Sequence, residues 1–230
     1  MQFDILNKTT LVVLFVMCLN FTGHAQSNLP YVDENFIHFG FSLGLNTMDF
    51  GVTATSDSVD ARVSTLKPGF SVGIISDLRL NRYLNLRFTP TLHFGERQLY
   101  FYPRRNNDSI SITSIPISLP IYLKYSSERK GNFRPYLICG GGISIDLATN
   151  KENPVLLKPV NLFAEFGVGC DIYFLFFKLA PEIKYSIGFN NIFVPLDQRD
   201  SGQMSADKQK FSLALSKLTS RMLTLTFNFE

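Results

Sequence analysis

Strict alternation of apolar and polar residues is the feature that most constrains how this chain can fold. It is cleanest in residues 84–95, where the apolar positions are Leu84, Leu86, Phe88, Pro90, Leu92 and Phe94. A period of two puts alternate side chains on opposite faces of a β-strand, whereas a helix needs a period near 3.6. Seven further segments, at 36–46, 70–80, 115–124, 133–147, 160–172, 178–188 and 223–229, share the pattern. The sequence therefore predicts an all-β fold of eight strands.

The connections between these segments alternate between long and short. The long ones span residues 47–66, 103–109, 148–158 and 190–220, and the short ones lie near 81–82, 126–132 and 174–176. An even number of antiparallel strands, with short turns at one end and long loops at the other, is typical of outer-membrane barrels. We therefore predict an eight-stranded antiparallel transmembrane up-and-down β-barrel with long outer loops and short periplasmic turns.

Alternation alone does not decide which face meets lipid, because a secreted lipocalin-like barrel shows the same period. The polar face is rich in Gly and Ser, as in Gly40, Ser42 and Gly44. Glycine weakens a strand and adds no solubility, so these residues fit a narrow lumen better than a solvated surface. The apolar face carries almost no charge at its central positions, as a lipid-facing band requires. The charged residues predicted to point into the lumen, and to pair across it, are Arg87, Lys124, Glu165, Asp171, Glu182 and Lys184.

The first 25 residues have the pattern of a signal peptide. Lys8 precedes a short apolar run from Leu11 to Leu19, and Gly23 and Ala25 occupy the positions that a signal peptidase reads. The run is shorter than the roughly 20 residues of a membrane-spanning helix. We predict cleavage after Ala25, a short periplasmic segment at 26–35, and a barrel domain at 36–230 in the outer membrane, in contact with its lipid.

Aromatic residues cluster where the strands would cross the two membrane interfaces. At the short-turn end we expect Phe36, Tyr83, Tyr125, Phe133, Tyr173, Phe177 and Phe229. At the long-loop end we expect Phe50, Phe70, Phe94, Phe189 and Phe193. The last segment, Thr226–Glu230, is similar to the closing strand that barrel-assembly machinery recognises, although Phe229 is penultimate rather than last.

No motif in the sequence indicates catalysis or a cofactor. Nucleotide-binding loops, CxxC pairs and Gly-x-Ser-x-Gly elbows are missing. His38 and His93 are the only histidines after the predicted signal peptide, and lumen packing explains them better than acid–base or metal chemistry. The net charge of +3 is too balanced for a nucleic-acid surface. We predict a protein that is not an enzyme and takes no cofactor, metal, nucleic acid or small-molecule substrate. Whether Cys139 and Cys170 pair stays open, with unpaired lipid-facing residues favoured.

A barrel of eight strands has an interior that its own side chains can fill, so function is expected in the loops and rims. Two regions could contact a partner. The third and fourth strands can continue beyond the bilayer as a ribbon whose edge could bind another strand, through Tyr100, Phe101 and Tyr102. In the last long loop, Phe211, Ala214, Leu215 and Leu218 have the spacing of an amphipathic helix. A strand extension through Phe211, Leu213 and Leu215 is the alternative.

The chain resembles the PorT family in Leu29–Glu34, Ile37–Asn46 and Met48–Phe50. The resemblance continues through Gly69–Leu92 and includes Arg134–Tyr136 and Phe227–Glu230, although these last two segments occur in many outer-membrane barrels. PorT proteins are small outer-membrane barrels required by the type IX secretion system, which exports proteases, adhesins and gliding-motility components. The resemblance implies an accessory or assembly role with partners in the secretion machinery, and it supplies no catalytic residues. A stand-alone surface barrel for adhesion or envelope stability, and a lipid-modifying barrel enzyme, are the alternatives.

Overall fold

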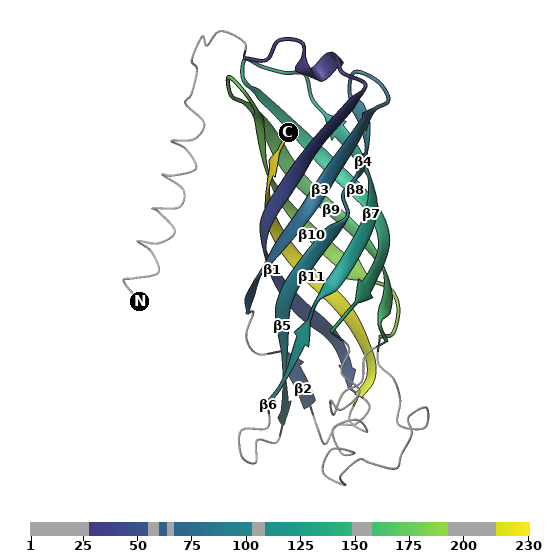
Figure 1. The fold of residues 1–230 in the computed structure, drawn as a ribbon. Coiled ribbons are helices and arrows are strands. Elements are labelled where there is room, and N and C mark those ends of the chain that lie inside the picture. Colours follow the sequence, from purple (N-terminus) through teal and green to yellow (C-terminus); the bar gives the residue numbers. More distant parts are fainter. Residues whose placement is uncertain (1–27, 55–59, 64–66, 103–108, 149–157, 193–214) are drawn as a thin grey trace, which may run out of the picture.

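The computed structural model describes residues 28–54, 60–63, 67–102, 109–148, 158–192 and 215–230. The predicted signal peptide, Phe193 and Phe211 lie outside these residues. Described strands form one sheet that closes on itself, with a short 3-10 helix, η1 (Val32–Glu34), at one end (Figure 1). The strands are β1 (Ile37–Ala54), β2 (Asp60–Val63), β3 (Pro68–Arg79), β4 (Leu84–Phe88), β5 (Thr91–Tyr102), β6 (Ser109–Ser114), β7 (Pro116–Ser126), β8 (Phe133–Asp146), β9 (Val160–Tyr173), β10 (Lys178–Gly188) and β11 (Leu215–Phe229).

Eight strands make up the barrel wall, because two pairs of elements each act as one strand. β4 and β5 together form the third wall strand, and β6 and β7 form the fourth. All pairings are antiparallel, and β1 closes the barrel by pairing with β3 on one side and with β11 on the other. The predicted eight-stranded antiparallel barrel is therefore confirmed. No helix among the described residues is long and apolar enough to cross a membrane.

The break between β4 and β5 falls at Thr89 and Pro90, inside a segment that alternates without interruption in the sequence. Proline has no N–H group to donate to a neighbouring strand, so pairing is interrupted there. Its carbonyl oxygen still accepts a hydrogen bond of 3.1 Å from the Ile74 amide on β3. The wall strand therefore stays paired with β3 in the same register on both sides of the break.

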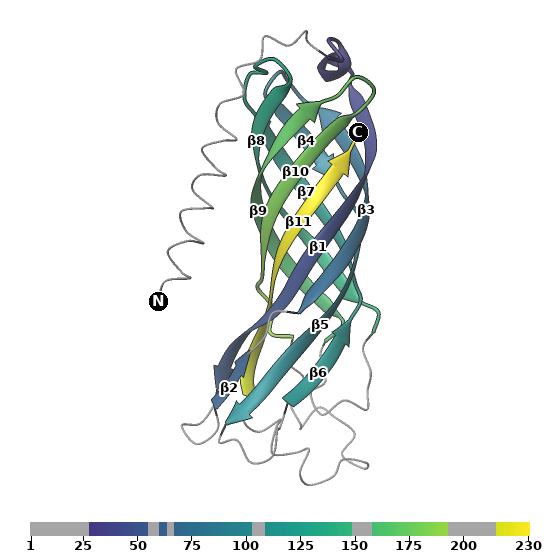
Figure 2. The same cartoon turned by 90° about the vertical axis from the view of Figure 1, so that its left-hand side faces the viewer.

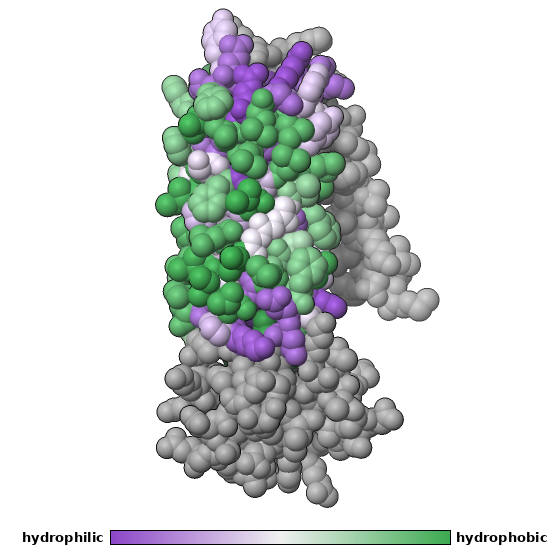
Figure 3. Space-filling model, turned by 90° about the vertical axis from the view of Figure 1, so that its right-hand side faces the viewer, coloured by the Kyte–Doolittle hydropathy of each residue, from purple (hydrophilic) through white to green (hydrophobic). Residues whose placement is uncertain are grey.

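Apolar side chains point outward along the barrel and polar ones point inward. On β1, for example, Phe41 and Leu43 are half exposed, whereas Ser42 and Asn46 between and beyond them are buried. Figure 3 shows the outer side as a belt of hydrophobic residues between two more polar ends. This arrangement is the reverse of a water-soluble barrel and suits a wall surrounded by lipid.

Glycines let neighbouring wall strands approach closely. A Cβ atom at Gly140 would collide with the carbonyl oxygen of Ile121 on β7, and one at Gly142 would collide with that of Leu119. The Gly140–Gly142 run therefore serves close backbone approach within the sheet, as its position inside a strand indicates.

Two strands are longer than the sequence pattern predicts. Residues 47–54, expected in a loop, continue β1 and pair with β11 up to Ala54. β11 itself begins at Leu215, eight residues before the predicted segment at 223. Leu215 and Leu218 thus belong to a strand, so a helix through these two residues is wrong and the strand extension is right. Phe211, Leu213 and Ala214 lie outside the described residues.

Two aromatic residues expected at the membrane interfaces point inward instead. Phe50 is 3% exposed and Tyr173 is 1% exposed. Phe50 lies on the lumen side of β1 because it continues the even-numbered series of Asn46 and Met48, both of which are also buried. The Tyr173 hydroxyl donates a hydrogen bond of 2.7 Å to Asp33, which holds the ring against the N-terminal segment.

Candidate functional site

The lumen contains a network of ion pairs centred on Arg87 of β4. Its guanidinium lies 2.7 Å from Asp77 of β3, 2.7 Å from Glu230 beside the end of β11, and 3.5 Å from Glu182 of β10. Asp77 and Arg87 face each other directly in the β3–β4 register, so strand pairing alone brings these two together. The side chains of all four residues are no more than 2% exposed. One arginine on β4 thus joins carboxylates from three other parts of the wall.

Three lysines complete the network. Lys124 lies 2.9 Å from Asp171, Lys178 lies 2.6 Å from Glu230, and Lys184 lies 3.1 Å from Glu182 and 3.5 Å from Glu165. Tyr136 donates a hydrogen bond of 2.7 Å to Glu182. The six charged residues named from the sequence (Arg87, Lys124, Glu165, Asp171, Glu182 and Lys184) are all buried inside the barrel and are members of these pairs.

Sequence reasoning missed two acidic members of this network, Asp77 and Glu230. Each could have been found by continuing the alternation, since Asp77 follows the lumen-facing Ser71 and Gly73, and Glu230 follows Thr226 and Asn228. The sequence does not predict which carboxylates pair with Arg87. Arg87 and Glu230 lie on strands that are not neighbours, and they meet only because the barrel closes.

The ion-pair network has a structural role rather than a reactive one. A buried charge is tolerated when it is paired and hydrogen-bonded, and removing one partner is strongly destabilising. Each of the lysines and carboxylates named above has a partner of opposite charge within 3.5 Å. These carboxylates therefore hold the wall together and fill the space inside it.

At the short-turn end, the N-terminal segment is tied to the barrel rim. Asp33 of η1 accepts a hydrogen bond from Tyr173 and lies 3.3 Å from Arg134 and 3.7 Å from Arg129. Arg129 also donates hydrogen bonds to the backbone oxygens of Leu29 and Asn28, and its guanidinium lies 3.6 Å from the centre of the Tyr173 ring. Figure 1 shows η1 lying across this end of the barrel. The segment therefore covers the rim that we assign to the periplasm.

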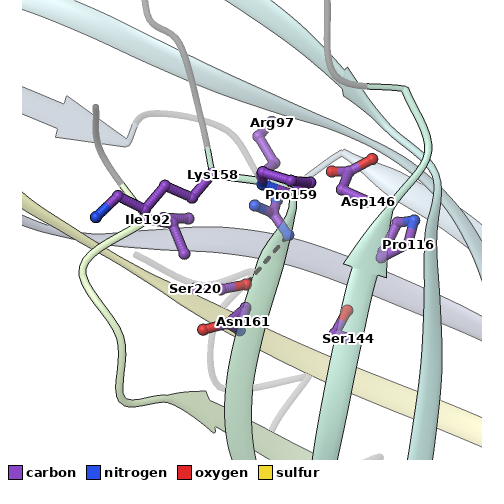
Figure 4. A pocket seen from close by; sticks show the side chains of 9 residues that line it. All are labelled: Arg97, Pro116, Ser144, Asp146, Lys158, Pro159, Asn161, Ile192 and Ser220. Carbon is purple, nitrogen blue, oxygen red and sulfur yellow. Dashed lines mark hydrogen bonds between the residues drawn. The ribbon is translucent and has the colours of Figure 1, made fainter. Parts of the chain in front are cut away.

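A small polar pocket lies at the other end of the lumen, inside the outer mouth. Its volume of about 20 Å³ suits roughly one water molecule. Arg97 points into it and donates a hydrogen bond of 3.1 Å to Ser220 (Figure 4). The Arg97 guanidinium also lies 4.8 Å from the centre of the Phe50 ring. The pocket is lined by Arg97, Pro116, Ser144, Asp146, Lys158, Pro159, Asn161, Ile192 and Ser220. It is too small for an organic substrate.

The histidines and cysteines form no reactive cluster in the described part of the chain. His38 bonds through Nε2 to the Val32 oxygen at 2.6 Å, and His93 is buried in the lumen. No group of three metal-ligating side chains occurs among the described residues. Cys139 is exposed, Cys170 is half-buried, and both are free, so they do not pair.

The outer ribbon has three strands instead of the two expected. β6 pairs with one side of β5, and β2 pairs with the other side through Asp60–Val63. Tyr100 thus faces Ser109 on one side and Arg62 on the other, so the edge of β5 is already occupied. Within the described strands β6 pairs only with β5, which leaves its other edge as the open one. Figure 2 shows the ribbon projecting at the end opposite η1.

The comparison with protein families fits this geometry. Residues 24–194 match the family model described as an outer membrane protein beta-barrel domain. The chain belongs to this family. It is accordingly a protein of the outer membrane, where its apolar belt contacts lipid.

Three solved structures illustrate the likeness. Neisserial surface protein A shares 11% identity at a TM-score of 0.42, over 84% of this chain and 98% of that one. The outer membrane protein OprG from Pseudomonas aeruginosa shares 13% identity at a TM-score of 0.46, over 84% of this chain and 92% of that one. The outer membrane protein AlkL, whose structure was determined in DMPC bilayers, shares 10% identity at a TM-score of 0.40, over 91% of this chain and 94% of that one. None of the curated proteins matches the chain.

Proposed function

We propose that this barrel is a non-enzymatic accessory or assembly subunit of the type IX secretion system, which acts by contacting other secretion proteins. The resemblance to the PorT family in residues 29–34, 37–46 and 48–50 supports this role. The observation that carries the mechanism is the filled lumen, because a lumen occupied by ion pairs favours contacts on the barrel surface over transport through the barrel.

A filled lumen argues against passage of solutes or polypeptide through the barrel. Arg87, Lys124 and Lys184 bridge the interior with their carboxylate partners, and η1 covers the periplasmic end. A secreted protein would need a lumen far wider than eight strands enclose. A subunit of this size can therefore support export only by assisting a larger translocon.

The polar groups of the lumen also offer little for catalysis. A hydrolase needs a nucleophile beside a base and an oriented acid. His93 and Glu96 come nearest to this arrangement in the sequence. The Glu96 carboxylate, however, forms an ion pair of 2.6 Å with Lys67. The lumen carboxylates are engaged by cations, which supports a structural role for them.

Two exposed regions are suited to protein contacts. Among the described strands, the outer edge of β6 has no partner, and an edge of this kind can bind an added strand. The segment 28–36, tied to the barrel by Asp33, presents Glu34 and the exposed Tyr31 toward the periplasm. A partner on either side of the membrane could use these surfaces.

Deletion of the gene, followed by analysis of the proteins in the culture medium, tests the proposal. We expect cargo of the secretion system to accumulate in the periplasm, and gliding to be lost where the host glides. Affinity purification of the tagged barrel in mild detergent should recover secretion proteins. An unchanged secretome, with the barrel purifying alone, would contradict the proposal and favour a stand-alone surface barrel.

A further inference from the structure

The β9–β10 turn is an apolar tip at the periplasmic end of the barrel. Its four residues are Phe174, Leu175, Phe176 and Phe177, and Phe176 is 91% exposed. The two other short turns are polar: Arg82 of one forms an exposed ion pair with Glu128 of the other at 3.5 Å. The β9–β10 turn is thus apolar throughout, whereas the other two short turns carry exposed charged residues at their tips.

The geometry of the turn does not require these residues. Phe174 donates a backbone hydrogen bond of 2.9 Å to the Phe177 oxygen, which closes a tight hairpin around Leu175 and Phe176. Tight hairpins favour Asn, Asp and Gly at the two central positions. Neither central residue has a positive φ. A large apolar pair at such a tip therefore calls for an apolar environment around it.

The tip continues the lipid-facing belt through a chain of aromatic contacts. Phe174 stacks on Phe177 with ring centres 4.9 Å apart, and Phe177 lies 6.2 Å from Phe229. Phe229 in turn stacks on Phe41 at 4.9 Å, and Phe41 is half exposed on the outer face of β1. The apolar surface is therefore continuous from the belt, which contacts lipid, to the end of the turn.

The backbone limits how deep the tip can lie. Within the described part of the chain, the amides of Leu175 and Phe176 donate no hydrogen bond. A peptide group without a partner is not tolerated in the hydrocarbon core, but it can bond to water and headgroups at the interface. Aromatic rings are favoured at the same level.

We propose that residues 174–177 bind the periplasmic leaflet of the outer membrane, with the rings at the boundary between headgroups and acyl chains. The tip anchors the β9–β10 side of the rim in lipid, while the β7–β8 turn, with its exposed Lys130, stays in water. The barrel is thereby held at a fixed depth and tilt. This anchor is independent of the role in secretion.

The chain contains no Trp, so a single introduced Trp reports on one site. Phe176→Trp and the control Lys130→Trp, each in the full barrel reconstituted in phosphatidylcholine vesicles, place the reporter on two turns of the same rim. We expect blue-shifted emission from Phe176→Trp, and loss of about half of it when the acyl chains are brominated near the headgroup. Lys130→Trp should show neither effect. Leu175→Trp provides a second reporter if Phe176→Trp does not fold.

Equal emission and equal quenching of the two reporters in folded barrels would overturn the proposal. A photo-reactive residue at position 176 in intact cells tests the alternative occupant, a periplasmic protein. Cross-linking to lipid alone is expected, and a discrete protein adduct would contradict the lipid anchor.

Discussion

Arg87 illustrates how single residues determine the interior of this barrel. Its guanidinium meets Asp77, Glu182 and Glu230 in a space that is closed to solvent. The surface pair of Arg82 and Glu128 has side chains that are 72% and 62% exposed. Ion pairs of these two kinds differ greatly in energy, because only a buried charge loses its hydration when the chain folds.

We expect Arg87→Met to lower the free energy of unfolding by about 3–5 kcal/mol, because it removes the cation that pairs with the buried Asp77 and one of the cations that pair with Glu182 and Glu230. Arg82→Met, the matched exposed change, should cost less than about 1 kcal/mol. Urea titration of the refolded barrel in vesicles, followed by its heat-modifiable mobility on gels, measures both. Equal losses would show that the lumen is wet and that its charges are screened.

Leu43 represents the opposite face of the wall. It lies midway along the apolar series of β1, pairs with Val72 and Phe227, and is 45% exposed. Leu43→Arg should destabilise the folded barrel by about 2–4 kcal/mol, since a charge near the bilayer midplane loses its hydration. Leu43→Met keeps the site apolar and should have little effect. The same urea titration distinguishes them, and a tolerated arginine would contradict the lipid-facing assignment.

At the scale of elements, alternation predicted the wall strands because lipid and lumen impose opposite demands on neighbouring residues. It failed where the lumen itself becomes apolar. Met48 and Phe50 point inward on β1, so the polar series ends there in the sequence while the strand continues to Ala54. β2 could not be foreseen, because four residues, Asp60–Val63, carry too short a pattern and their pairing with β5 is non-local.

Alternation also predicted which charged residues point into the lumen. Arg87 and Lys124 could be assigned to the interior from strand position alone. Their partners depend on how the strands are staggered around the closed barrel, which a single sequence does not reveal. The sequence predicts Phe177 at the membrane interface, but it does not predict an exposed apolar tip at residues 174–176, because turns are usually recognised from Gly, Asn, Asp and Pro.

The ribbon is the element through which we expect contacts with the secretion machinery. Tyr100 pairs with Ser109 of β6 and Arg62 of β2, so its amide is directed at one of these two neighbours. Tyr100→Pro removes that donor and should disrupt the ribbon while leaving the membrane-embedded wall intact. Secretion should fall, while Tyr100→Val, which retains the strand, should preserve it. Both variants are assayed for cargo in the medium and for heat-modifiable folding. Normal secretion by a folded Tyr100→Pro barrel would exclude the ribbon as the contact surface.

For the whole molecule, the central claim is that the barrel is closed. The buried ion pairs fill the lumen around Arg87, Lys124 and Lys184, and residues tied to Asp33 cover the periplasmic end. At the outer mouth, the pocket beside Arg97 has room for about one water molecule. Under the proposed function, a barrel with this interior acts through its surfaces and not through its lumen.

Ion conductance across a planar bilayer tests this claim most directly. Purified, folded barrel should produce no steady current under an applied voltage, because buried ion pairs around Arg87, Lys124 and Lys184 occupy the lumen. A barrel of known pore-forming activity, reconstituted in the same way, controls for insertion. A stable, reproducible current from the folded wild-type protein would contradict the closed lumen, and with it the proposal that this protein acts through contacts alone.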